Sequence, residues 1–115
     1  MTARDPRREL LPGTLDMLVL RTLSIEPLHG YAIAQHIAKL SNEVLQVEQG
    51  SLYPALERLL SSGWATAQWG ISPTGRRARY YTLTASGRRK LGHEISEFDN
   101  LLLAIARVLG RAEPA

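Results

Sequence analysis

Apolar side chains recur at helical spacing in four stretches of this chain. Spacing of i, i+3, i+4 and i+7 is typical of helices that bury one face, and it predicts helices over residues 13–24, 29–40, 51–62 and 85–109. The first of these has apolar residues on two faces, which indicates burial on both sides. We expect Thr14 to cap its start. The predicted buried positions of the second helix are Ile33, Ala34, Ile37 and Leu40.

The third predicted helix has its apolar residues on one side and polar residues on the other. Leu52, Leu56, Leu59 and Leu60 define the inward side. A proline inside a helix costs about 3 kcal/mol, whereas the first N–H groups of a helix have no partner within it. Pro54 therefore predicts a helix start close to Gly50. The residues on the outward side, or at its edge, are Ser51, Tyr53, Pro54, Arg58 and Ser61.

Two short segments, 64–69 and 78–83, have the threonine, tryptophan and tyrosine content of strands. The segment between them, 70–77, contains two glycines, a proline, a serine and a threonine. These residues favour turns, so we expect a β-hairpin with an exposed tip.

The last predicted helix follows Thr84, a plausible N-cap, and carries apolar residues spaced 4, 3, 4, 3 and 4 apart. A heptad seam of this kind is typical of paired helices. We predict that it joins two copies of the chain; the alternative is a helix folded back on its own domain. The seam residues are Leu91, Ile95, Phe98, Leu102, Ile105 and Leu109.

The 115 residues are enough for one domain. We expect a mobile N-terminal arm over residues 1–12, a globular part over 13–84 and a dimerisation helix over 85–110. The predicted fold class is mainly α with a small β-hairpin, that is, α+β. No cysteine is present, and so we expect no disulfide framework or thiolate metal site.

Charge is distributed very unevenly along the chain. The stretch 58–93 holds seven of the 14 Lys and Arg residues and none of the 11 Asp and Glu residues. Unopposed positive charge is what a polyanion requires for docking, because it replaces the counterions condensed on phosphates. A basic chain also suits an acidic membrane surface, and charge alone does not choose between the two partners.

Several other classes of protein find little support in the sequence. There is no run of eighteen apolar residues, and the polar N-terminus does not resemble a secretion signal; we therefore expect a cytoplasmic protein with no membrane partner. Nucleophile-elbow, phosphate-loop and zinc-protease motifs are not found, so we expect no enzyme and no cofactor. His29 and His36 lack the further ligands of a metal site, and we interpret His29 as a helix cap.

Three helices followed by a hairpin with a basic tip is the order of a winged helix-turn-helix protein, in which the third helix enters the major groove. This order predicts binding to double-stranded DNA. The expected contacts are Ser51, Tyr53, Pro54 and Arg58 on the third helix and Arg76, Arg77 and Arg79 on the hairpin.

Four segments together resemble the PadR family of bacterial transcriptional regulators. They are residues 28–34 (LHGYAIA), 49–59 (QGSLYPALERL), 63–64 (GW) and 75–88 (GRRARYYTLTASGR). The resemblance implies a homodimeric winged-helix repressor that binds an inverted repeat, with a recognition helix opening at Ser51 and a basic wing at Arg76, Arg77 and Arg79. It also implies that the first helix, through Leu15, helps the last helix to pair the two subunits. The short C-terminal region is similar to the compact branch of that family.

The resemblance also raises the question of an effector, because some family members respond to small aromatic molecules. The drug-binding branch uses a tryptophan in the last helix, where this chain has Phe98. Trp64 and Trp69 lie at the predicted strands instead. They either pack in the core or the dimer interface, or line an effector pocket together with Phe98.

Two functions are consistent with these patterns. The first is a sequence-specific homodimeric repressor on a pseudo-palindromic operator, released by a small-molecule effector. The alternative is a winged-helix adaptor that binds another protein and ignores DNA.

Overall fold

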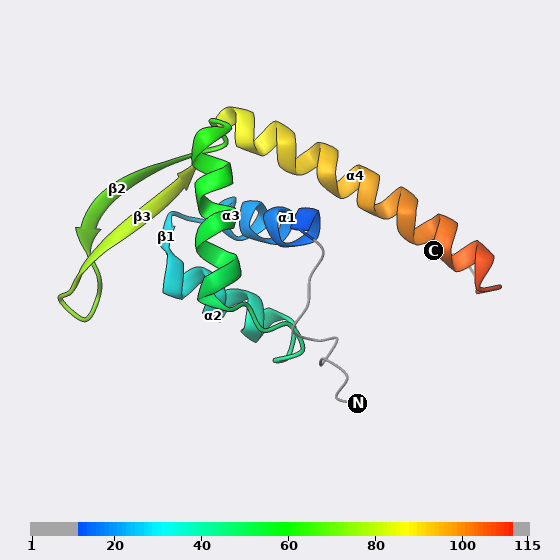
Figure 1. The fold of residues 1–115 in the computed structure, drawn as a ribbon, viewed down its shortest axis with the longest axis horizontal. Coiled ribbons are helices and arrows are strands. Elements are labelled where there is room, and N and C mark those ends of the chain that lie inside the picture. The colour runs from blue at the N-terminus through cyan, green and yellow to red at the C-terminus, as the bar shows by residue number, and fades with distance from the viewer. Residues whose placement is uncertain (1–11, 112–115) are drawn as a thin grey trace.

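The computed structural model describes residues 12–111, which form four helices and a three-stranded antiparallel sheet (Figure 1). The predicted α+β winged-helix class is therefore confirmed. The expected N-terminal arm lies outside the described residues, except for Pro12. The elements in chain order are α1 (Pro12–Leu23), β1 (Leu28–His29), α2 (Gly30–Leu40), α3 (Gln49–Ser61), β2 (Ala65–Ile71), β3 (Arg77–Leu83) and α4 (Ala85–Val108).

Helix α1 lies at the centre of the molecule, in contact with α2, α3, α4 and β3. Its Val19, Leu20 and Leu23 are almost completely buried. The two apolar faces seen in the sequence are thus covered by other elements of the same chain. Leu15, which we expected at a dimer seam, is 5% exposed and belongs to this core instead. The expected cap at Thr14 is also wrong, because the helix begins at Pro12.

Helix α2 begins after His29, whose Nδ1 accepts a hydrogen bond of 3.2 Å from the backbone N–H of Ala32. The interpretation of His29 as a cap is therefore confirmed. Ile33 and Ile37 are buried as predicted, but Leu40 is 70% exposed. Leu40 is the last residue of the helix, and a turn follows it at residues 41–43.

Helix α3 begins two residues earlier than predicted, at Gln49, and the carbonyl of Glu48 accepts hydrogen bonds from the N–H groups of Ser51 and Leu52. This start is within one residue of Gly50, where Pro54 predicted it, although Pro54 itself, the sixth residue of the helix, lies just beyond the first turn. The leucines explain why the helix tolerates it. Leu52, Leu56 and Leu59 are at most 1% exposed, and burying each stabilises the fold by about 1.5–3 kcal/mol, which outweighs about 3 kcal/mol for one interior proline.

Strands β2 and β3 form the predicted hairpin, which is longer than expected and has a shorter tip at residues 72–76. The register pairs Ala65 with Leu83 at the base and Ile71 with Arg77 at the tip. At the tip, the N–H of Ser72 donates to the carbonyl of Arg76 at 2.7 Å, and Gly75 has a φ of 83°, which favours glycine. Strand β1 was not predicted; it pairs Leu28 and His29 with Tyr81 and Tyr80 of β3.

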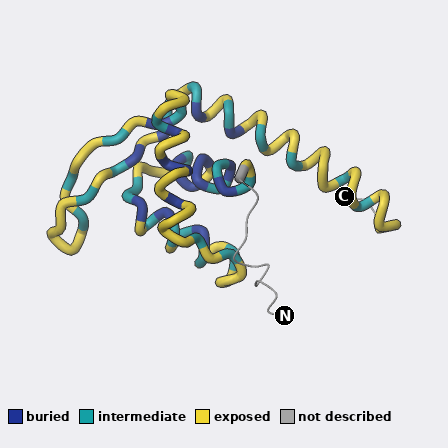
Figure 2. The backbone as a smooth tube through the Cα atoms, viewed as in Figure 1, coloured by how far each residue is buried: buried dark blue, intermediate teal, exposed yellow. Residues whose placement is uncertain are grey.

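The start of α4 is hydrogen-bonded to residues 63–64, which connect α3 to β2. Thr84 caps the helix as predicted, accepting from the N–H of Gly87 at 3.0 Å, and its hydroxyl donates to the carbonyl of Gly63 at 2.7 Å. The N–H of Thr84 donates to the carbonyl of Trp64 at 3.0 Å. We call this set of contacts the α4 junction. Beyond it, the first half of α4 packs against α1, and the second half extends away from the other elements (Figure 1) and is mostly exposed (Figure 2).

Candidate nucleic-acid interface

A groove of about 930 Å³ separates the hairpin from the N-terminal parts of α2 and α3. Tyr31 and Gln35 of α2 and Tyr53 of α3 form one side, and the hairpin forms the other. Arg76, Arg77 and Arg79 all line the groove, and among residues 12–111 no Asp or Glu does so. The groove therefore combines aromatic surface with unopposed positive charge. We call it the wing groove.

The strand register explains why the hairpin arginines face this groove. Residues directly opposite each other in an antiparallel pair point to the same face. Trp69 is opposite Arg79, and Ile71 is opposite Arg77, so these four side chains share one face of the hairpin. The Arg77 guanidinium lies 4.5 Å from the centre of the Trp69 ring, and that of Arg79 lies 5.7 Å from the centre of the Tyr81 ring.

Tyr81 forms the floor of the groove and is 3% exposed. Burial raises the pKa of its hydroxyl above the ordinary value, and the nearby positive charge of Arg79 opposes this shift. The hydroxyl is thus neutral at physiological pH. Tyr81 adds no negative charge to a surface that faces three arginines.

Tyr53 lies over the start of α2, where Gly30 makes room for it. A Cβ atom added to Gly30 would approach the Tyr53 hydroxyl oxygen at 3.1 Å and its ring at 3.2 Å. Tyr53 itself is 45% exposed. The glycine thus allows the ring to rest against the α2 backbone while one side of it remains accessible from the groove.

Arg58 is placed differently from the hairpin arginines. Its Nε and Nη2 donate to the two carboxylate oxygens of Asp16 in α1, at 3.1 and 2.7 Å. The hydrogen bond to Asp16 raises the pKa of Arg58 above its ordinary value. A bidentate pair occupies the guanidinium edge that a phosphate would use, and Arg58 does not line the wing groove. In the free chain the Arg58 guanidinium is therefore engaged in a contact between α3 and α1, which does not favour the expected DNA contact.

Of the seven predicted DNA-binding residues, the groove brings together Tyr53, Arg76, Arg77 and Arg79. Ser51 and Pro54 are exposed on the same half of α3 as Tyr53 but do not line the groove. The sequence pattern missed Tyr31, Gln35 and Trp69. Tyr31 and Gln35 are four residues apart on the exposed side of α2, a spacing that could have indicated a shared surface.

The predicted effector pocket is not formed by the single chain. Trp69 is in the wing groove, whereas Phe98 lines a separate cavity with Met17 and Leu101, between α1 and α4. Trp64 precedes β2 at the opposite end of the hairpin from Trp69, about 16 Å away at the rise of a strand. Of the alternatives left open for Trp69, packing in the core of its own chain is excluded, since its side chain is 61% exposed.

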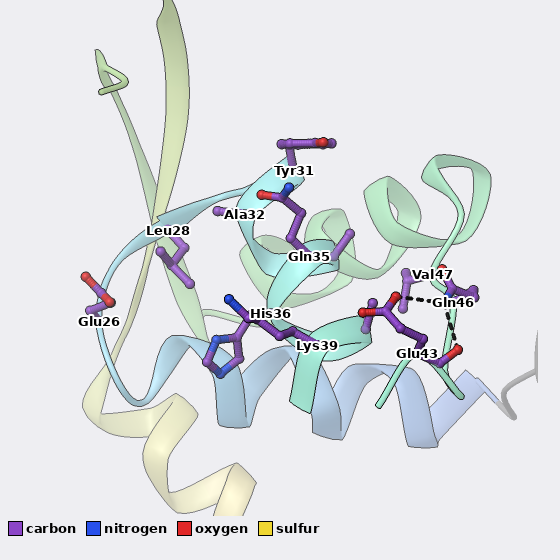
Figure 3. Close-up of a pocket in the computed structure, with 12 residues that line it drawn as sticks. Glu26, Leu28, Tyr31, Ala32, Gln35, His36, Lys39, Glu43, Gln46 and Val47 are labelled. Carbon is purple, nitrogen blue, oxygen red and sulfur yellow. Dashed lines mark hydrogen bonds between the residues drawn. The ribbon is translucent and has the colours of Figure 1, made fainter. Parts of the chain in front are cut away.

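A second cavity of about 680 Å³ lies along the outer face of α2 (Figure 3). Its lining is of mixed charge: Glu26 and Glu43 accompany Lys39. Glu43 accepts hydrogen bonds from the Gln46 side chain at its carbonyl and carboxylate oxygens, at 2.8 and 3.3 Å. Two carboxylates make this cavity less suitable for a polyanion than the wing groove.

The predicted seam on α4 divides into two parts. Leu91 is 8% exposed, and Phe98 is partly buried against the core, so both pack within this chain because α1 covers the first half of α4. Ile95, Leu102, Ile105 and Leu109 are 39–60% exposed. Leu101 and Val108 add to the same exposed surface at 52% and 87%. We call these six residues the α4 seam.

Three helices with a basic hairpin and a third helix exposed beside it are the arrangement of winged-helix DNA-binding regulators. Residues 19–93 match the family model described as the transcriptional regulator PadR-like family. The chain therefore belongs to the PadR-like family of transcriptional regulators. No helix in the described part, residues 12–111, is long and apolar enough to span a membrane.

Individual proteins agree with this assignment. A PadR family transcriptional regulator from Eggerthella lenta is 32% identical, with 84% of this chain and 82% of that chain covered and a TM-score of 0.73. A transcriptional regulator from Clostridium thermocellum is 25% identical, with coverage of 83% and 89% and a TM-score of 0.76. An uncharacterised protein from Lysinibacillus sphaericus is 28% identical over 92 residues, which is 80% of this chain and 84% of that protein.

Proposed function

We propose that this transcriptional regulator is a homodimeric repressor that binds duplex DNA through α3 and the wing groove of each subunit. The proposal rests on the groove itself, in which three arginines and two exposed tyrosines meet, with no carboxylate from the described part of the chain among them. Guanidinium groups in such a setting suit phosphate oxygens. The N-terminal half of α3, with Ser51 and Tyr53 exposed, would face the major groove beside them.

The α4 seam supports the homodimer. It presents six large apolar residues on a helix that extends beyond its own core, and exposed apolar surface of this kind is typical of protein–protein contacts. Two copies joined along α4 would place two recognition helices about one turn of DNA apart, which suits an inverted repeat. Because the single chain does not form the expected aromatic pocket, the proposal includes no effector.

The proposal is tested by the salt dependence of binding to duplex DNA. Each phosphate neutralised contributes about 0.9 to the slope of log K against log salt. We expect Arg76→Ala and Arg77→Ala each to lower that slope by about 1, because each removes a cation from the wing groove. The measurement is fluorescence anisotropy with a duplex selected from random sequence, over a series of salt concentrations.

Arg111→Ala is the matched control, because it removes the same charge from an exposed residue beyond the end of α4. Its slope should equal that of the wild-type protein. An affinity that does not change with salt would overturn the proposal and favour the protein-interaction adaptor instead.

A further inference from the structure

We propose that Trp69 is a positioning residue for DNA binding: its indole ring holds the Arg77 guanidinium within the wing groove, with the N–H donors free to meet a phosphate. The proposal rests on the proposed function, since it assigns a role to a residue within the same surface. Neither the charge pattern nor the apolar pattern of the sequence places Trp69 among the DNA contacts.

The exposure of Trp69 requires an explanation that core packing does not provide. A large aromatic side chain contributes most to stability when it is buried, yet Trp69 is 61% exposed near the end of a hairpin. Ile71, its neighbour on the same face, is 69% exposed. What Trp69 does contact is Arg77, whose guanidinium carbon lies 4.5 Å from the ring centre.

The geometry of a stacked guanidinium makes this contact different from an ion pair. The five N–H donors of arginine lie in the guanidinium plane, whereas a cation over an aromatic ring is attracted through its face. Stacking on Trp69 therefore restrains Arg77 without using its donors. Arg58 shows the opposite case, because Asp16 occupies two of its donors.

The other tryptophan provides an internal comparison. Lys90 Nζ lies 4.7 Å from the centre of the Trp64 ring, and it also forms an ion pair of 3.3 Å with Glu94. This cation is engaged by a carboxylate on its own helix, at the α4 junction and outside the wing groove. Trp64 thus resembles Trp69 in its cation contact but lacks a free cation facing the groove.

A double-mutant cycle tests the coupling between Trp69 and Arg77. At exposed sites a cation–π contact corresponds to roughly a two- to fivefold change in an equilibrium constant. We expect Trp69→Ala to weaken binding to a random-sequence duplex at low salt by roughly this factor, with an unchanged salt slope because the charge remains. Trp69→Tyr should retain most of the affinity, since tyrosine also stacks with arginine. In the Arg77→Ala background, Trp69→Ala should have no further effect.

Intrinsic fluorescence gives a second readout, because the chain contains only two tryptophans. In a Trp64→Phe variant, we expect the emission of Trp69 to change as duplex DNA is added. In the matched Trp69→Phe variant, the emission of Trp64 should stay constant. Circular dichroism of each variant checks that the fold is retained.

The outcomes separate this inference from the proposed function. The positioning role would be overturned if Trp69→Ala lowered the affinity for DNA equally in the wild-type and Arg77→Ala backgrounds, or if it left the affinity unchanged. Either result would leave salt-dependent DNA binding intact. If the affinity of the wild-type protein for duplex DNA did not depend on salt, the proposed function itself would be overturned. A change in Trp64 emission with none in Trp69 emission would place DNA away from the wing groove, against both.

Discussion

At the scale of single residues, two arginines show how the environment decides what a guanidinium can do. Arg58 and Arg77 are both exposed, and both lie in the basic stretch 58–93. Asp16 holds Arg58 by a bidentate pair, whereas Trp69 holds Arg77 by its ring. The first arrangement links α1 to α3, and the second leaves hydrogen-bond donors exposed. We therefore expect opposite effects when each is removed.

Arg58→Ala should lower the free energy of unfolding by about 0.5–1.5 kcal/mol, a range kept small because the Arg58 side chain is 46% exposed. Its salt slope for DNA binding should match that of the wild-type protein. Urea unfolding and the anisotropy titration measure the two effects. An unchanged stability together with a slope reduced by about 1 would mean that Arg58 leaves Asp16 to reach a phosphate.

The sequence could suggest the basic residues of the site but not which of them are already engaged. Arg58 and Asp16 are 42 residues apart, so no local spacing indicates their pairing. Arg76, Arg77 and Arg79 could be assigned because they occupy the hairpin, whose turn residues are recognisable. The sequence left Trp69 open between the core, the dimer interface and an effector pocket; the strand register, which the sequence did not specify, places it beside the arginines.

At the scale of elements, the α4 junction determines how the last helix leaves the winged-helix part. Gly87 is buried there, and a Cβ atom at this position would meet the Trp64 carbonyl oxygen and lie 2.6 Å from Leu83 Cδ1. The first turn of α4 thus packs directly on backbone. Such an approach is open only to glycine, and it fixes the helix start more firmly than the Thr84 cap alone.

Gly87→Ala should lower the free energy of unfolding by about 1–3 kcal/mol, because backbone must move to admit the methyl group. Gly92→Ala lies in the same helix, with nothing within 4 Å of the added atom. It should raise the free energy of unfolding by about 0.5–1 kcal/mol through helix propensity. Chemical unfolding of both variants measures the difference. Equal effects at the two glycines would contradict the packing described for the junction.

Element types were predictable because periodicity and capping residues are local. The four helices and the hairpin lie where the sequence places them, within two residues at their ends. Strand β1 could not be predicted, because two residues show no alternation and pair only once β3 is in place. The start of α3 lies within one residue of Gly50, as Pro54 predicted, and the burial of the leucines is the tertiary effect that lets the helix accept this proline.

At the scale of the whole molecule, the chain consists of a packed winged-helix part and a helix that extends from it (Figure 1). The winged-helix part buries its core within one copy, since α1 is covered on several sides by its own chain. The second half of α4 is different, because its apolar residues have no cover among residues 12–111. This contrast supports the proposal that pairing uses α4 rather than α1.

Introducing charge into the α4 seam should therefore separate the copies without unfolding them. We expect Leu102→Glu/Ile105→Glu to sediment as a monomer in analytical ultracentrifugation, because two carboxylates would have to be buried in the dimer. Asn100→Glu adds a carboxylate to the other side of the same helix and should leave the mass of a dimer. Identical masses for the two variants would exclude the seam as the interface.

The fold class was predictable from the order of elements, because a hairpin after three helices has few packing solutions. The division of α4 into a covered and an uncovered half was not. Its heptad pattern continues from Leu91 to Leu109 without a break, and only the position of α1 shows that the first part of the pattern serves the chain's own core.

Because α4 is long, a small tilt at the α4 junction produces a large displacement of the far end of the helix. Its 24 residues span about 36 Å, so a tilt of about 10° at Thr84 would displace the far end by about 6 Å. In a dimer joined by those far ends, the same relation holds in reverse. A small change in the angle at which the two α4 helices cross would move the two winged-helix parts apart, and the spacing of their recognition helices would no longer match one turn of the duplex.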